Sequence, residues 1–74
     1  MQKIILTIHV RHRMAERGIS LRQLRAAFRS PATVEPARHG CQKLISFVQG
    51  RFLTVIFEEK GPEICVVLTA YWRD

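Results

Sequence analysis

The apolar residues of this 74-residue chain change their spacing along the sequence. Residues 3–8 are rich in β-branched and aliphatic side chains, which predicts a short first strand. In residues 9–30 the apolar positions recur every three or four residues and so share one face of a helix. From residue 42 onward they alternate with polar residues or run almost continuously, as is typical of strands. The pattern therefore predicts helices packed on a sheet.

Local signals give the first helix clear ends. Thr7 is available as its N-cap. Gly18 suits the left-handed position that follows a helix, and Ile19 would then contact Met14, as in a Schellman motif. We therefore expect a short helix that ends at Gly18.

A second helix begins directly afterwards. Ser20 and Gln23 have the spacing of a capping box. The helix ends at Ser30 because the residue before a proline avoids the helical region. Its expected buried side chains are Leu21, Leu24 and Phe28.

Three strands follow, over Gln42 to Gln49, Arg51 to Glu58 and Glu63 to Tyr71. Gln49-Gly50 is a plausible tight hairpin turn, and Thr33-Val34-Glu35 is read as a turn or an edge strand. The last two strands are nearly continuous apolar runs, which indicates a central place in the sheet. We expect a single α+β domain over residues 1–74, with two N-terminal helices packed on one face of a three- to four-stranded antiparallel sheet.

The positive charge is unevenly distributed. The chain has 12 basic and 6 acidic side chains, a net charge of +6. Residues 1–30 contain seven basic side chains and one acidic side chain, whereas residues 31–74 contain five of each. Nine of the twelve basic residues are arginine, which binds phosphate and carboxylate through two parallel hydrogen bonds. A polyanion is the natural partner of the helical half.

Composition excludes several classes of protein. No apolar run approaches the roughly 18 residues of a membrane span, and the N-terminus lacks the features of a secretory signal, so we expect a cytoplasmic protein without a membrane partner. Cys41 and Cys65 are expected to be reduced and inert. His9 and His12 are too few ligands for a metal site, so neither a metal nor a cofactor is expected. His39 lies in a loop and receives no role.

His-x3-Arg-x3-Arg-Gly-Ile, at His9, Arg13, Arg17, Gly18 and Ile19, is followed by a helix that ends in Ser-Pro and a β meander that closes on Leu-Thr-Ala-Tyr. This arrangement resembles a family of small bacterial proteins classed as a domain of unknown function. More remotely, two N-terminal helices on an antiparallel sheet resemble the RelE and BrnT toxin ribonucleases. That resemblance implies a RelE-like fold, metal-independent RNA cleavage and a partner antitoxin.

Residues 9–17 carry the candidate chemistry. Metal-free RNA cleavage needs a base for the 2′-OH, a cation for the developing phosphorane charge and an acid for the leaving oxygen. His9 is the candidate base, and Arg13 and Arg17 are the candidate cations. Tyr71 would donate a proton or stack on a base, provided that the last strand brings it beside the helix. The alternatives are a structural histidine and arginines that pair with Glu16.

Three further arginines recur on the second helix, at Arg22, Arg25 and Arg29. They form either a stripe that contacts RNA phosphates or a solubilising face. We expect the aromatic residues of the strands to pack in the core or on the sheet rather than to form a stacking platform: Phe47, Phe52, Phe57 and Trp72.

The leading hypothesis is a toxin-like endoribonuclease of a toxin–antitoxin type system. One alternative is a non-catalytic nucleic-acid-binding module, and another is a basic interaction domain that docks an acidic partner. The expected partners are RNA, alone or on the ribosome, and an antitoxin protein. Both a monomer and an oligomer are compatible with the sequence.

Overall fold

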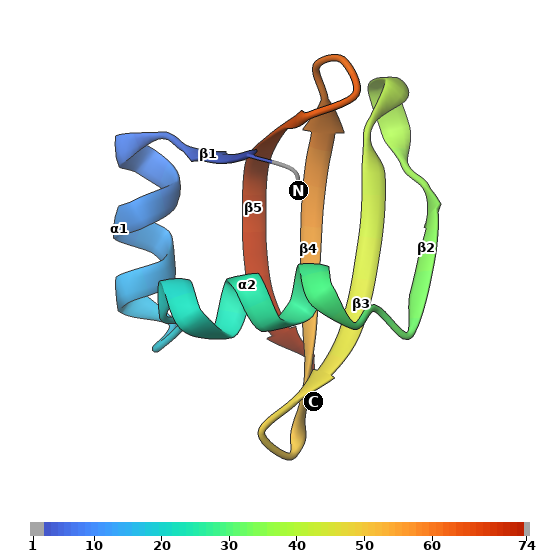
Figure 1. The fold of residues 1–74 in the computed structure, drawn as a ribbon. Helices are drawn as coiled ribbons and strands as arrows, with labels where there is room; N and C mark the ends of the chain where they lie inside the picture. Colours follow the sequence, from blue (N-terminus) through green and yellow to red (C-terminus); the bar gives the residue numbers. More distant parts are fainter. Residues whose placement is uncertain (1–2, 74) are drawn as a thin grey trace.

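The first and last strands of the chain lie side by side, and the helices follow the first strand (Figure 1). The computed structural model describes residues 3–73. The sheet has the order β1-β5-β4-β3-β2, in which β1 is parallel to β5 and the other neighbours are antiparallel. The elements are β1 (Lys3–Leu6), α1 (Ile8–Glu16), α2 (Leu21–Arg29), β2 (Thr33–Pro36), the 3₁₀ turn η1 (Arg38–Gly40), β3 (Gln42–Val48), β4 (Arg51–Glu59) and β5 (Ile64–Arg73).

The expected sheet was wrong in three respects, although the α+β class is confirmed. The sheet has five strands, it is mixed rather than antiparallel, and β1 precedes both helices, so they are not the N-terminal elements. The reason is the partner of β1: Lys3 pairs with Ile64, at the far end of the sequence. Parallel strands are not joined by a hairpin turn, so the sequence contains no local turn signal from which the pairing of β1 with β5 could be predicted.

Local capping signals did place the ends of both helices correctly. The Thr7 hydroxyl accepts a hydrogen bond from the Val10 amide at 3.2 Å and caps α1. Gly18 adopts φ of 67°, and the Ile19 amide donates to the Met14 carbonyl at 2.8 Å, which completes the Schellman motif.

The capping box of α2 is formed in both directions. The Gln23 amide donates to the Ser20 hydroxyl at 3.1 Å, and the Ser20 amide donates to the Gln23 side chain at 2.8 Å. Two of the free amide groups at the helix start are therefore satisfied without tertiary contacts.

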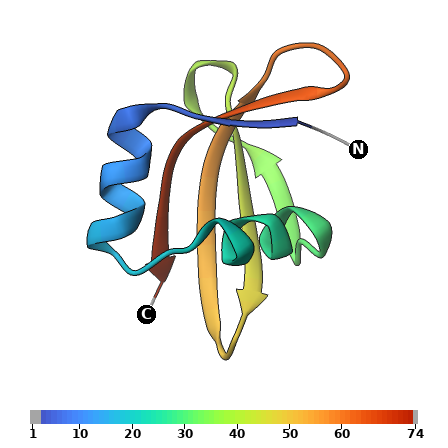
Figure 2. The ribbon, with the colours of Figure 1, turned by 60° about the vertical axis from the view of Figure 1, so that its left-hand side comes forward.

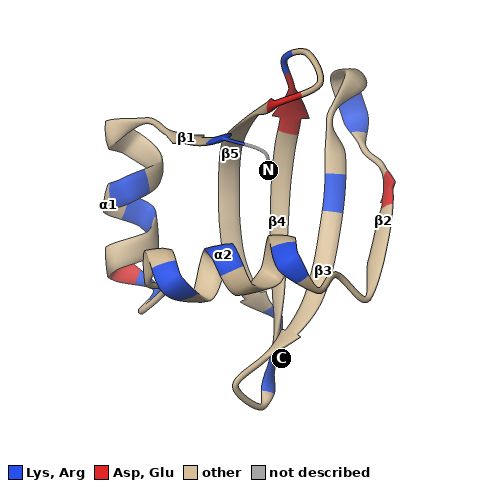
Figure 3. Ribbon diagram, in the orientation of Figure 1, with Lys and Arg blue, Asp and Glu red and all other residues tan. Residues whose placement is uncertain are grey.

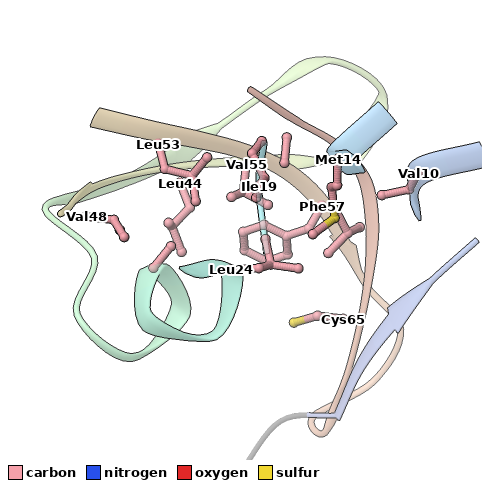
Figure 4. Close-up of a cluster of buried hydrophobic side chains, with 13 residues drawn as sticks. Val10, Met14, Ile19, Leu24, Leu44, Val48, Leu53, Val55, Phe57 and Cys65 are labelled. Carbon is pink, nitrogen blue, oxygen red and sulfur yellow. The ribbon is translucent and has the colours of Figure 1, made fainter. Parts of the chain in front are cut away.

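Both helices lie against one face of the sheet, which we call the covered face (Figures 1 and 2). α2 crosses the strands and α1 lies beside β5. Leu24 and Ala27 of α2 are fully buried, and the Phe28 ring meets the Phe57 ring edge to face at 5.0 Å. At the end of α2 the Ser46 hydroxyl donates to the Ser30 carbonyl at 2.7 Å. Figure 4 shows the buried side chains between the helices and the strands.

The opposite face carries the alternate residues of the same strands, and we call it the open face. Where β4 and β5 pair, Ile56 lies opposite Thr69 and Phe57 opposite Val67, so Leu68 is an extra residue that forms a β-bulge. The bulge shifts the alternation of β5 by one residue, so that Val67 and Ala70 both face the helices and Thr69 and Tyr71 both lie on the open face. No helix within residues 3–73 is long and apolar enough to cross a membrane.

Candidate nucleic-acid interface

Packing of α1 sets which of its side chains reach solvent. Val10 and Met14 are buried against the sheet, so the arginines between them, Arg11 and Arg13, project outward. His9 lies in the first turn of the helix and is also exposed. The row of basic and imidazole side chains predicted from the helical spacing is therefore accessible to a ligand.

His9 and Arg13 line the same shallow depression on the outer side of α1. His12, Ala15 and Glu16 complete its lining. The depression thus combines two imidazoles, one guanidinium and one carboxylate within two turns of helix. Imidazole groups accept and donate protons near neutral pH, and a guanidinium binds phosphate oxygens.

Arg17 is engaged elsewhere. Its Nη1 atom donates to the Ala70 carbonyl at 2.9 Å and to the Thr69 hydroxyl at 3.3 Å. In return, the Trp72 indole donates to the Arg17 carbonyl at 2.9 Å. β1 pairs with β5 only as far as Val67, so Arg17 satisfies a carbonyl on the edge of β5 beyond that point. Arg17 therefore fastens the end of α1 to the sheet and does not line the depression.

Tyr71 is not part of the depression either. Its neighbour Ala70 is buried on the covered face, whereas Tyr71 pairs with Thr54 and lies on the open face. The four residues predicted to act together are thus divided: His9 and Arg13 share a depression, Arg17 holds the edge of β5, and Tyr71 is on the other side of the sheet.

The three arginines of α2 all lie on its exposed side, as expected. Figure 3 shows basic positions along both helices, while the acidic positions of the sheet gather in β2, at the end of β4 and in the turn before β5. Glu16 is the one acidic residue of the two helices. We call the exposed arginines of the two helices the basic helical layer: Arg11, Arg13, Arg22, Arg25 and Arg29.

Two other chemical groups have shifted pKa values, and neither extends the site. Burial, with a smaller contribution from the charge of Glu59, raises the pKa of the Cys65 thiol. The hydrogen bond and charge of Glu58, at 2.7 Å, raise the pKa of the Lys60 ammonium. Both cysteines are buried and carry free thiols, as the sequence predicted. Within residues 3–73 no group of three or more histidine, cysteine or acidic side chains is placed to hold a metal ion.

Two aromatic residues are exposed, which the sequence did not predict. Phe47 and Phe52 do pack on the sheet, edge to face at 5.1 Å, but they lie on the open face and are 61% and 45% exposed. Phe57 is buried, and Trp72 is half-buried against the core with Arg51 above its ring. The alternation of Phe47 with Val48 carried the missing signal, because the helices can cover only one of the two faces.

The chain matches a known protein family. A family described as "Domain of unknown function (DUF4258)" matches residues 6–72, a span that contains both helices and the paired strands β2 to β5 as far as Trp72. No curated protein and no solved structure matches the chain.

Proposed function

This chain belongs to the DUF4258 family, a domain of unknown function, and we propose from its own residues that it binds RNA through the basic helical layer. The carrying observation is that five exposed arginines lie on two consecutive helices that contain one acidic residue. An ordinary solvated surface mixes both signs of charge. A surface with this excess attracts a polyanion and releases its counterions on binding.

The α2 arginines form a row along the helix that a nucleic-acid strand can follow. Arg22, Arg25 and Arg29 follow one side of the helix and span about 10 Å along its axis, at 1.5 Å per residue. Leu24 and Ala27 fix the opposite side of α2 against the sheet, so the row is held on a rigid element. A rigid row of guanidinium groups matches successive phosphates of a nucleic-acid strand.

The test measures binding of a fluorescein-labelled single-stranded RNA by anisotropy at several salt concentrations. The variant Arg22→Gln/Arg25→Gln/Arg29→Gln should bind more weakly. Its slope of log affinity against log salt should be shallower by about 2, because each phosphate contact on a single strand contributes about 0.7. Lys3→Gln/Arg38→Gln/Lys60→Gln removes the same charge outside the layer and serves as the control.

If the two triple variants lose affinity equally, net charge rather than the helical layer is responsible, and the proposal fails. A DNA strand of the same sequence is measured in parallel. Equal affinity for both strands would show that the phosphates alone are recognised.

RNA cleavage is a second candidate function, supported by the shared depression of His9, His12, Arg13 and Glu16. In this proposal His9 removes the 2′-OH proton, the 2′ oxygen attacks the phosphorus, and Arg13 stabilises the charge of the phosphorane. The bond from phosphorus to the 5′ oxygen then breaks, and His12, in the same depression, donates a proton to the leaving 5′ oxygen. Only RNA supplies the 2′-OH. A toxin role with an antitoxin partner rests on this second candidate.

The cleavage test compares His9→Ala with His39→Ala, an exposed histidine in η1. His9→Ala should abolish cleavage of the labelled RNA and leave its affinity almost unchanged, whereas His39→Ala should cleave like the wild type. Intact RNA after incubation with wild-type protein in the presence of EDTA would contradict metal-independent cleavage.

A further inference from the structure

The hairpin that joins β3 and β4 places an arginine over the only tryptophan of the chain. The guanidinium carbon of Arg51 lies 4.4 Å from the centre of the Trp72 ring. Trp72 is half-buried against the core, and its indole N–H donates to the Arg17 carbonyl at 2.9 Å. The ring is therefore fixed by packing and by a hydrogen bond, and it holds the exposed Arg51 side chain through a cation–π contact.

The position of Arg51 suits it to contact a flat ligand. Because its guanidinium lies over the ring, a ligand that approaches this side of Trp72 meets Arg51 first. A guanidinium is planar and stacks on nucleic-acid bases, whereas the ammonium group of lysine does not. The contact with Trp72 also restricts the arginine rotamers, so Arg51 loses less conformational entropy when it binds a base.

The hairpin is joined to the start of α2. The Gln23 side chain donates to the side-chain oxygen of Gln49 at 2.6 Å. Arg22 directly precedes Gln23 in the first turn of α2, and Arg51 is two residues beyond Gln49. Figure 3 shows the basic position of the hairpin close to the row of α2. A nucleic-acid strand that follows the α2 arginines can therefore continue from Arg22 to Arg51.

The hairpin end of the molecule is itself positively charged. Arg73 is exposed and pairs with Phe52, the residue after Arg51. Within residues 3–73, every acidic side chain except Glu16 lies in β2, at the end of β4 or in the turn before β5. A phosphate backbone is thus attracted to the hairpin end as well as to the helices.

We propose that an unpaired RNA base stacks on the Arg51 guanidinium, at the end of a path that begins at the α2 arginines. This inference rests on the proposed RNA binding by the basic helical layer, and it specifies the class of RNA as single-stranded. In a duplex each base is already stacked on its neighbours, so only an unpaired base can offer its flat face to Arg51. The two contacts differ in kind, because the α2 arginines bind phosphates and Arg51 binds a base.

The test compares a fluorescein-labelled single-stranded RNA with a strand of the same length whose bases are replaced by abasic units. Arg51→Lys keeps the positive charge and removes the planar group. This variant should bind the single strand about fivefold to tenfold more weakly than wild type and the abasic strand equally well. Its salt dependence should not change, since the charge is kept. Arg38→Lys, an exposed arginine in η1, is the matched control and should bind both strands like wild type.

The fluorescence of Trp72 reports on the same position, because the chain has one tryptophan. Unlabelled single-stranded RNA should change the emission of wild-type protein as binding saturates. An RNA duplex should change it less, because its bases are not free to stack. An emission that stays constant at saturation with the single strand overturns the proposal.

Two results of the affinity measurement also overturn it. If Arg51→Lys loses equal affinity for the RNA and the abasic strand, Arg51 contacts only the backbone, and if it loses none, Arg51 makes no contact. A change of Trp72 emission with polyglutamate but not with RNA would assign the hairpin end to an acidic polypeptide instead. RNA binding that depends on the α2 arginines but not on Arg51 contradicts this inference alone, whereas wild-type protein that binds no RNA contradicts the proposed function as well.

Discussion

The two faces of the sheet are made from alternate residues of the same strands, yet one face is buried and the other is exposed to solvent. Val48 and Leu53 on the covered face are almost inaccessible, whereas their immediate neighbours Phe47 and Phe52 are about half exposed. Phenylalanine is no less hydrophobic than valine or leucine. The position of the helices, and not hydrophobicity, therefore decides which apolar residues form the core.

The two faces contribute differently to the stability of the chain. The covered face buries side chains from both helices and four strands, and this burial supplies most of the folding free energy. The open face contributes less and leaves its aromatic rings exposed. Substitutions on the two faces should therefore have very different effects on unfolding.

The largest difference is expected between Leu24→Ala and Phe47→Ala. Leu24 is fully buried, and its truncation leaves a cavity, so the free energy of unfolding should fall by about 3 kcal/mol. Phe47→Ala, measured by urea unfolding, should lose less than about 1 kcal/mol. Similar losses in both variants would contradict the distinction between the faces.

A smaller effect is expected at the edge of the sheet, where α1 meets β5. Arg17→Ala removes two hydrogen bonds to β5 and should lower the free energy of unfolding by about 1.5 kcal/mol. Arg13→Ala, in the depression, should leave stability within about 0.5 kcal/mol and weaken RNA binding instead. Thermal unfolding and anisotropy on the same two variants check both halves of this prediction.

The open face contains one unfavourable group, and its removal should stabilise the protein. Among the buried side chains of residues 3–73, the Thr54 hydroxyl is the polar group without a hydrogen-bond partner. Thr54→Val keeps the shape and removes the hydroxyl, so the unfolding free energy should rise by about 1 kcal/mol. Thr54→Ser keeps the hydroxyl and loses a methyl group, and it should be less stable than wild type. A destabilised Thr54→Val would show that the hydroxyl has a partner after all.

The smallest effect concerns pH and the covered face. Burial raises the pKa of Cys65 above its value in the unfolded chain. Below the unfolded pKa both states keep the proton, and above it only the unfolded chain releases the proton, so stability falls as pH rises through that range. Urea unfolding between pH 7.5 and 10 should show a shallower decline for Cys65→Ala than for wild type.

Much of the local structure follows from the sequence alone. Thr7, Gly18 and the Ser20–Gln23 box fix the ends of the helices through hydrogen bonds between residues three to five positions apart. The turn at Gln49-Gly50, with φ of 49° and 82°, sets the register of β3 and β4 in the same way.

The candidate site was predictable only in part. Helical spacing placed His9 and Arg13 on one side of α1, and the structure brings both to one depression. The same spacing could not show that Arg17 turns to the edge of β5. It also could not show that Tyr71 lies on the open face. The position of Arg17 depends on how far β1 pairs with β5, and the position of Tyr71 depends on the bulge at Leu68.

By itself the sequence determined the helix boundaries, the hairpin turn and the concentration of arginine in the helical half, since each depends on neighbours along the chain. Only the tertiary structure decided the parallel pairing of β1 with β5, the fastening of Arg17 and the face of the sheet that the helices cover. These depend on contacts between residues far apart in the sequence. Alternation gives every strand two faces, and the placement of α1 and α2 selects the one that is buried.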